Sequence, residues 1–334
     1  KRQWLDYSGR INHNKQKNAN KGSFPHGGAG RILSFQKKME KPLERKQNRM
    51  DQNRMPLVEA LQQFREEAPA YFRIPGHRFE RGLDEALNGA SLAAYDLSEA
   101  EGLDDLHHAE GVIAEAQRLA AETWKAKKTF FLVNGTTCGN EAMVLSSVKE
   151  GEKIIVPRNV HKSVLMGLIL CGATPVYVMP EYSTKWQMWG GVTPETIEKA
   201  FAETPDAKAV LLVSPTYYGL CSDLQAIAEI CHCHNAALLV DEAHGSHLYF
   251  SEQLPLGALE SGADACAQSI HKTAGSFTQS SFLSLGSGRL DEARVAANLQ
   301  MVQSTSPSYL LMASLDAARR GMALHGNCLL YTSP

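Results

Sequence analysis

Residues 209–244 read AVLLVSPTYYGLCSDLQAIAEICHCHNAALLVDEAH, and this stretch decides the fold. It holds two short apolar runs, Ala209–Val213 and Ala237–Val240, separated by a helical pattern over Leu224–His234. Short apolar runs indicate strands that are buried on both faces, and strands that alternate with helices indicate parallel pairing. The stretch therefore predicts one strand–helix–strand unit of an α/β fold.

The same alternation continues on both sides of this unit. Four further apolar runs predict strands: Thr129–Val133, Lys153–Val156, Pro175–Met179 and Ala265–Ser269. Helical patterns lie between most of the strands and cover Gly139–Lys149, Lys162–Cys171 and Pro194–Glu203. We therefore expect an α/β fold with a mostly parallel sheet and helices on both of its faces.

Charge is distributed unevenly along the 334 residues. The first 54 residues hold 14 Lys and Arg against 4 Asp and Glu, whereas the remainder holds 20 against 32. Residues 1–50 show no helical or strand periodicity, so we interpret them as a basic, disordered or non-native extension; a basic arm for nucleic acid is the alternative. Residues 51–326 are expected to form the main domain, and residues 327–334 match no element pattern and are interpreted as a non-native-looking tail.

Seven cysteines are scattered along the chain, several of them in apolar runs. This usage is typical of a reduced, cytoplasmic protein rather than of a disulfide framework. No run of 18 apolar residues and no apolar signal-peptide core is present, so we expect neither a membrane helix nor a secretory signal. The string Cys231-His232-Cys233-His234 lacks the spacing of a structural zinc site, so no bound metal is expected.

Polar clusters follow five of the predicted strands, at the edge where open α/β sheets bind their ligands. In Ser269-Ile270-His271-Lys272, a lysine just beyond a buried strand can be desolvated, which favours the neutral amine that forms an imine. In Asp241-Glu242-Ala243-His244, a partly buried aspartate needs a cationic partner such as a protonated pyridine nitrogen. The small Ala243 would let a flat ring lie against the backbone. A surface lysine, and a helix-capping or metal-binding acid, are the alternatives.

The string Gly135-Thr136-Thr137-Cys138-Gly139 joins a strand to a helix. Backbone N–H groups and two hydroxyls at a helix N-terminus suit a phosphate, although ordinary capping by threonine gives the same pattern. The string is neither a Walker loop nor a dinucleotide-binding glycine motif. His161 opens another predicted helix, where it is either structural or stacked on a flat cofactor.

Together, these clusters resemble the bacterial ornithine/lysine/arginine decarboxylase family, which has the pyridoxal 5'-phosphate (PLP)-dependent, aspartate-aminotransferase-type fold (fold type I). The resemblance covers about residues 55–326. It is carried by an ordered set of motifs at residues 72–78, 101–107, 134–137, 159–163, 215–219, 241–245, 269–273 and 304–309. The set is specific as a whole, although no single motif is.

The resemblance implies a role for each of these clusters. Lys272 would carry PLP as a Schiff base, Asp241 would keep the pyridine nitrogen protonated, and His161 would stack on the ring. The implied catalytic residues are Lys272, His161, His244 and Asp241. The implied cofactor-binding residues also include Gly135, Thr136, Thr137, Thr216, Ala243, Ser269 and His271, of which Thr136, Thr137, Ser269 and His271 would hold the phosphate. Thr305 and Ser306 would reach the site of a neighbouring subunit.

The implied reaction is the decarboxylation of arginine, lysine or ornithine to an amine and CO2, in cytoplasmic polyamine biosynthesis, by a homodimer or an assembly of dimers. No nucleic-acid or membrane partner is expected. Family members continue into a smaller C-terminal domain, and some carry a receiver-like N-terminal domain. We expect neither here, which indicates a truncated member of the short, biosynthetic type. An aminotransferase or amino-acid lyase on the same fold, an inactive truncated fragment and a basic-arm nucleic-acid binder are the alternatives.

Overall fold

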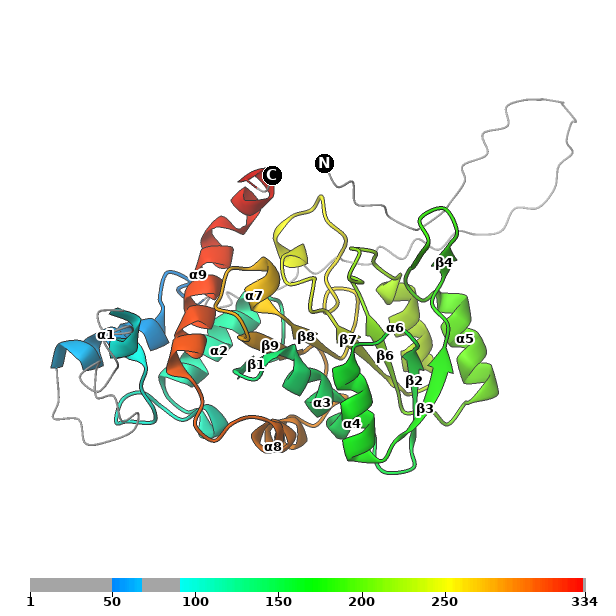
Figure 1. Cartoon of the computed structure of the whole chain (residues 1–334), viewed down its shortest axis with the longest axis horizontal. Coiled ribbons are helices and arrows are strands. Elements are labelled where there is room, and N and C mark those ends of the chain that lie inside the picture. The colour runs from blue at the N-terminus through cyan, green and yellow to red at the C-terminus, as the bar shows by residue number, and fades with distance from the viewer. Residues whose placement is uncertain (1–49, 68–90, 333–334) are drawn as a thin grey trace, which may run out of the picture.

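A seven-stranded sheet forms the centre of the computed structural model, which describes residues 50–67 and 91–332 (Figure 1). Its strands are β1 (Lys128–Leu132), β2 (Lys153–Pro157), β3 (Thr174–Val178), β6 (Ala209–Val213), β7 (Ala237–Asp241), β8 (Ala265–Gln268) and β9 (Ser281–Leu285). They lie in the order β1-β9-β8-β7-β6-β2-β3. The neighbours from β3 to β8 are parallel, and β9 runs antiparallel to both β8 and β1. The sheet is thus mostly parallel, as predicted.

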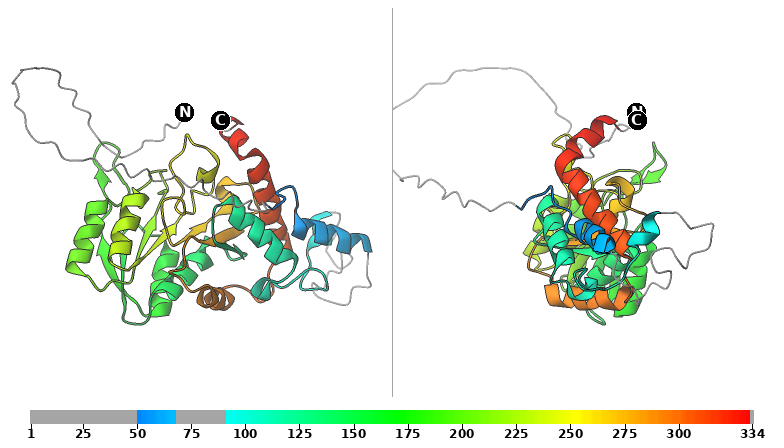
Figure 2. Two further views of the ribbon diagram at one scale, coloured as in Figure 1. Left: turned by 180° about the vertical axis from the view of Figure 1, so that it is seen from behind. Right: turned by 90° about the vertical axis from the view of Figure 1, so that its left-hand side faces the viewer.

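Helices cover both faces of the sheet (Figures 1 and 2). One face carries α3 (Gly135–Ser147), α4 (Lys162–Cys171) and α8 (Glu292–Val302), and the other carries α5 (Pro194–Glu203) and α6 (Leu224–Cys233). At the β1–β9 end, α1 (Pro56–Glu67), α2 (Val112–Thr123) and α9 (Tyr309–Thr332) pack together. The short elements are η1 (Ser91–Tyr95), η2 (Leu106–His108), β4 (Tyr182–Ser183), β5 (Met188–Trp189), η3 (Leu248–Phe250) and α7 (Ile270–Thr273).

The side-chain alternation of the strands explains these layers. On β2, Ile154 and Val156 are buried against α3 and α4, whereas Ile155 between them is buried against the α5 and α6 layer. A third cluster lies under α2 and α9, where the ring of Phe282 stacks on Phe131 at 5.1 Å. Since both faces exclude water, most strand positions are apolar, which is why most of the strands appear in the sequence as apolar runs.

The predicted elements agree with the structure over most of the sheet. The bounds of α4, α5 and β6 are as predicted, and the other predicted strands differ by one residue at one or both ends. Other elements were missed. Strand β9, Ser281–Leu285, and helices α1, α2, α8 and α9 were not predicted, and α9 continues to Thr332 although no element was expected from residue 327 onwards. The Leu- and Ala-rich composition of residues 310–330 favours helix and explains the continuation. The interpretation of residues 1–49, and the motif at residues 72–78, lie outside the described residues.

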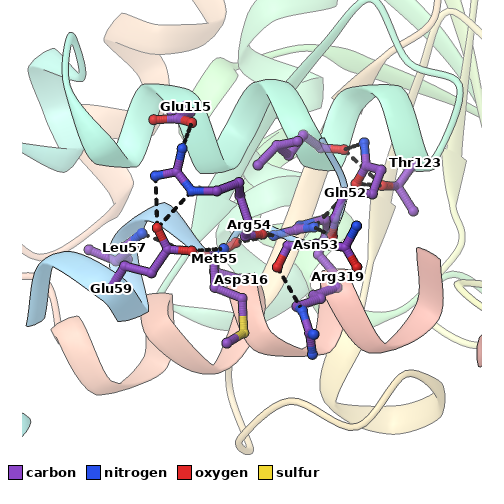
Figure 3. A network of polar contacts seen from close by, with 12 residues as sticks. Gln52, Asn53, Arg54, Met55, Leu57, Glu59, Glu115, Thr123, Asp316 and Arg319 are labelled. Carbon is purple, nitrogen blue, oxygen red and sulfur yellow. Dashed lines mark hydrogen bonds and ion pairs between the residues drawn. The ribbon is translucent and has the colours of Figure 1, made fainter. Parts of the chain in front are cut away.

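A buried polar network fixes the segment that leads into α1. Figure 3 shows this segment lying between α2, which contributes Glu115 and Thr123, and α9, which contributes Asp316 and Arg319. The Arg319 guanidinium is fully buried and donates to Asp316 Oδ1 at 2.7 Å and to the Gln52 carbonyl at 2.9 Å. Asp316 also accepts from the backbone N–H of Leu57 at 3.2 Å. A buried pair of this kind is stable only when its remaining hydrogen bonds are made, as they largely are here.

The two histidines near the end of α6 have structural contacts. His232 Nε2 lies 3.0 Å from Asp264 Oδ2, and the ring of His234 stacks on Phe201 with centroids 4.3 Å apart. In the described ranges, no group of three or more His, Cys, Asp or Glu side chains is arranged to hold a metal ion. No helix of residues 50–67 and 91–332 has the length and apolar character needed to cross a membrane.

Candidate active site

The first turn of α3 lies at the carboxyl end of β1. Gly135 opens the helix with φ of +75°, a backbone conformation that favours glycine. The N-cap residue Asn134 makes no side-chain hydrogen bond to the first N–H groups of the helix. At Gly139, a Cβ would lie only 2.9 Å from Leu132 Cδ1, so glycine allows α3 to pack closely on the sheet. The first turn therefore presents backbone N–H groups at the strand ends, which suits an anion.

Three buried hydroxyls gather beside this turn. Thr136 Oγ1 lies 2.6 Å from Ser269 Oγ and donates to Ser281 Oγ at 3.1 Å. The three residues come from α3, from the end of β8 and from β9, so the sheet places together hydroxyls that are far apart in the chain. Thr137, on the same turn, is exposed. Ser281 was not among the predicted site residues, because strand β9 itself was not predicted.

Asp241 ends β7 and is 3% exposed. Its Oδ2 accepts from Asn140 Nδ2 at 2.8 Å, and its Oδ1 accepts from the backbone N–H of Ala243 at 3.2 Å. Burial raises the pKa of Asp241, while its two hydrogen bonds and the positive charge of Lys272 oppose the increase. Both donors are neutral groups, so the site favours a further cation next to this carboxylate.

His161 is connected to Asp241 through two residues. As the N-cap of α4, His161 accepts at Nδ1 from the backbone N–H of Ser163 at 3.3 Å, and Nδ1 lies 2.8 Å from Ser163 Oγ. That hydroxyl accepts from Asn140 Nδ2 at 2.9 Å. Sequence reasoning assigned no role to Asn140 or Ser163. The available indication was the spacing of Asn140, which lies four residues after Thr136 and hence on the same face of α3.

Lys272 lies in α7, directly after β8, with an exposed side chain. Its Nζ is 3.5 Å from His244 Nε2. Burial, together with the charges of Lys272 and His247, lowers the pKa of His244, which favours the neutral imidazole. The ring of Tyr217 meets that of His244 edge-on at 5.7 Å. These side chains form the outer rim of the site.

A cavity of about 1020 Å³ borders the site on the Lys272 side. It lies between α1, α7 and α9, and most of its lining is apolar. Polar and aromatic groups on its wall include His271, Lys272, Tyr95, Phe277 and His325. His271 is oriented by a hydrogen bond from its Nδ1 to the Ser280 carbonyl at 2.8 Å. The cavity gives Lys272 access to a volume large enough for a small organic molecule.

Two other predicted site residues make mainly local contacts. Thr216 is buried and follows the cis Ser214–Pro215 peptide bond. Its Oγ1 accepts from the Leu220 N–H at 3.2 Å and its carbonyl accepts from the Gly219 N–H at 2.9 Å, so it closes a turn. Ala243 is 8% exposed and donates its N–H to Asp241. Ala243 thus belongs to the immediate surroundings of Asp241, whereas the hydrogen bonds of Thr216 described here stay within residues 216–220.

Thr305 and Ser306 are exposed, in a segment held beside the start of α3. The Ser304 carbonyl accepts from His107 Nε2 at 2.8 Å, and the Ser304 N–H reaches Asn134 Oδ1 at 3.4 Å. His107 belongs to the motif at residues 101–107, whose Asp104 carboxylate also accepts backbone N–H groups at the start of α2. This motif therefore has a structural role: it begins α2 and orients the segment that carries Thr305 and Ser306.

Comparison with known proteins identifies the family. The Orn/Lys/Arg decarboxylase major domain matches residues 55–331. The chain is 46% identical over 285 residues to the arginine decarboxylase of Halalkalibacterium halodurans, covering 84% of this chain and 58% of that protein. It is 43% identical over 283 residues to the arginine decarboxylase of Bacillus subtilis, with the same shares of 84% and 58%. The chain thus spans somewhat more than half the length of these relatives.

A solved structure agrees with this result. Lysine decarboxylase A from Pseudomonas aeruginosa superposes with a TM-score of 0.73 at 28% identity, covering 83% of this chain and 41% of that one. The expected fold class, the large domain of PLP-dependent transferase-like enzymes, is therefore confirmed. The sequence match over residues 55–331 and this superposition show that the chain belongs to the Orn/Lys/Arg decarboxylase family, through the major domain of that family.

Proposed function

We propose that this chain is the cofactor-binding part of a PLP-dependent decarboxylase that acts on a basic amino acid. The observation that carries the proposal is the buried carboxylate of Asp241, held by two neutral donors at a strand end and stabilised by the positive charge of Lys272. Family membership supports the same reading, since two of its curated relatives are arginine decarboxylases.

The residues present fit PLP at both ends of the molecule. The N–H groups of α3, with Thr136, Ser269 and Ser281, offer hydroxyl and amide donors to a phosphate. Asp241 offers a buried carboxylate to a protonated ring nitrogen. Thr136 and Asn140, which hold the two ends, lie four residues apart on one face of α3, about 6 Å along the helix axis. One helix thus spaces the phosphate end and the nitrogen end of the site.

Each side chain then has a defined task. Bound PLP would supply an electron sink for the carbon that loses CO2. Lys272 would hold the cofactor through its amine until the substrate amine replaces it, and Asp241 would keep a proton on the ring nitrogen. His161 would cover one side of the ring and exclude water. Lys272 Nζ and His244 Nε2, 3.5 Å apart, would return a proton to the substrate carbon and give the amine.

Arginine is the substrate that the relatives favour. The arginine decarboxylases are 46% and 43% identical to this chain, compared with 31% for lysine decarboxylase LdcA of Pseudomonas aeruginosa. We place the reaction in cytoplasmic polyamine biosynthesis. We also propose a homodimer, or an assembly of dimers, in which Thr305 and Ser306 reach the neighbouring site. Their exposure supports this role, and the contacts of Ser304 hold them in place.

The proposal is tested by trapping the cofactor. The protein is incubated with PLP, reduced with borohydride and digested, and the pyridoxyl group is located by peptide mapping. We expect it on Lys272; modification of another lysine would contradict the assignment. The amine products formed from arginine, lysine, ornithine and glutamate are then compared. Formation of a keto acid instead of an amine would replace decarboxylation by transamination.

A further inference from the structure

We propose that Asn140 and Ser163 are positioning residues that hold His161 as a neutral ring with its proton on Nε2, while fixing the orientation of the Asp241 carboxylate. The importance of this arrangement for catalysis rests on the proposed function, whereas the arrangement itself does not. Asn140 and Ser163 are each 1% exposed and lie on α3 and α4, so the pair also links two helices of the same face.

The direction of the hydrogen bonds begins at the Asn140 amide. Nδ2 lies 2.8 Å from Asp241 Oδ2 and 2.9 Å from Ser163 Oγ. An amide nitrogen carries two hydrogens, and these two acceptors use both of them. The opposite amide orientation would place Oδ1 against the Asp241 carboxylate and leave the two hydrogens without these partners. The observed orientation leaves Oδ1 buried without a hydrogen-bond partner in the described structure, but it keeps both hydrogens bonded and avoids the contact between two oxygens, so the surroundings favour it.

The next step fixes the proton on His161. Because Ser163 Oγ accepts from Asn140, its own hydrogen is available to donate to His161 Nδ1, 2.8 Å away. The backbone N–H of Ser163 donates to the same nitrogen at 3.3 Å. A ring nitrogen that accepts two donors has no proton of its own, so in the neutral ring the proton is on Nε2.

This arrangement has a consequence for the proposed cofactor site. The ring of His161 is oriented by its two Nδ1 contacts with Ser163, and Nε2–H takes no part in them. A neutral ring with a fixed orientation can lie against a flat cationic ring without adding a second positive charge. The same Asn140 amide keeps one oxygen of Asp241 occupied and so limits the positions that the carboxylate can take. Two predicted site residues are thus oriented by one amide group.

Capping of α4 alone would not need this arrangement. An N-cap contact requires only His161 and the Ser163 N–H, both on the same helix. Asn140 belongs to α3 and contributes nothing to a cap on α4. If capping were the whole explanation, removal of the Asn140 amide would leave the His161 ring unchanged. The two explanations therefore differ in the effect of a substitution on a separate helix.

The test is nitrogen NMR of the protein without added cofactor, with ¹⁵N-labelled His and Asn side chains. The His161 signals are identified by their loss in His161→Gln. We expect the wild-type ring to carry its proton on Nε2, and both Asn140 amide hydrogens to be protected from solvent exchange. The Nδ1 resonance should move towards that of a nitrogen without a hydrogen bond in Ser163→Ala. It should move in the same direction, and less, in Asn140→Leu.

Ser147→Ala is the matched control, because it removes a hydroxyl at the end of α3 that bonds only to the Val144 carbonyl in the described structure. It should leave the Nδ1 resonance unchanged. A proton on Nδ1, rapid exchange of either Asn140 amide hydrogen, or an unmoved Nδ1 resonance in folded Ser163→Ala would overturn the proposal. The position of the His161 proton and the exchange of the Asn140 amide hydrogens in the wild type test the proposal even if Asn140→Leu does not fold. Failure to bind PLP would contradict the proposed function and leave these readings valid.

Discussion

Glu242 is a buried carboxyl group whose titration should be measurable as a change in stability. It is fully buried and accepts hydrogen bonds from Tyr249 Oη at 2.8 Å, from the Ala258 N–H at 2.7 Å and from Gln268 Nε2 at 2.8 Å. Burial outweighs these bonds and raises the pKa of Glu242 from 4.5 to about 7. The group is therefore expected to titrate near neutral pH in the folded protein.

The sign of the effect follows from linkage. A carboxyl group with a higher pKa in the folded than in the unfolded protein binds its proton more tightly when folded. The free energy of unfolding therefore falls as the pH rises from about 4.5 to about 7, and it stays lower above that range. Since one pKa unit corresponds to about 1.4 kcal/mol, the loss from Glu242 is about 3 kcal/mol.

Glu242→Gln removes this titration. Between about pH 5 and about pH 8, the wild-type protein should lose about 2.5 kcal/mol more stability than the variant, measured by urea unfolding at several pH values. The raised pKa of Asp241 adds a slope of the same sign, but both proteins share it, so it cancels in the comparison. Tyr249→Phe keeps the carboxyl group and removes a hydrogen bond that lowers its pKa, so its loss of stability with rising pH should be at least as large as that of the wild type. If the free energy of unfolding depended on pH in the same way in the wild type and in Glu242→Gln, the reasoning would be refuted.

Three further predictions concern the site and the network of Figure 3. Lys272→Ala should abolish the absorbance of covalently held PLP and leave the melting temperature nearly unchanged, because the side chain is exposed. Lys153→Ala, which removes another surface lysine, is the control and should keep the absorbance. Retained absorbance in Lys272→Ala would exclude Lys272 as the residue that holds PLP. Asp241→Asn should bind PLP yet slow amine formation more than about a hundredfold, as loss of a buried counter-ion costs about 3–5 kcal/mol; near-normal turnover would mean that Asp241 does not face the ring. Arg319→Leu should destabilise the protein by about 3–5 kcal/mol, because Asp316 remains buried without its partner; an unchanged urea midpoint would contradict this.

The strand-end rule explains how two residues of the candidate site could be located from the sequence. Asp241 and Lys272 each follow a continuous apolar run, and the carboxyl ends of parallel strands meet at one edge of the sheet. Their positions could therefore be inferred without knowing a single contact. Asn140 and Ser163 could not be found in this way, because they lie inside helices, where an isolated buried polar residue produces no periodic pattern. Their importance depends on which helices lie side by side.

Strand β9 escaped prediction for a related reason. Two of its five residues are serines, Ser281 and Ser284, which sequence patterns associate with loops. Both are fully buried, and each hydroxyl has a partner on another element: Ser284 Oγ lies 2.9 Å from Thr129 Oγ1, and Ser281 Oγ accepts from Thr136. The strand therefore contains polar residues, but the fold provides a hydrogen-bond partner for each serine hydroxyl. Such compensation depends on the cross-strand register, which a single sequence does not reveal.

The neighbouring carboxyl groups at the end of β7 show how one strand can serve two purposes. Successive side chains on a strand point to opposite faces, so Asp241 turns towards α3 and Glu242 turns towards the layer beyond the other face. Asp241 meets Asn140 and the candidate site, whereas Glu242 holds Tyr249 and the Ala258 N–H in the connection between β7 and β8. Substitutions at the two positions should therefore affect different properties. Those at Asp241 should change cofactor chemistry, and those at Glu242 should change stability and its pH dependence. A loss of cofactor chemistry in both would mean that the connection between β7 and β8, and not Asp241 alone, sets the position of the ring.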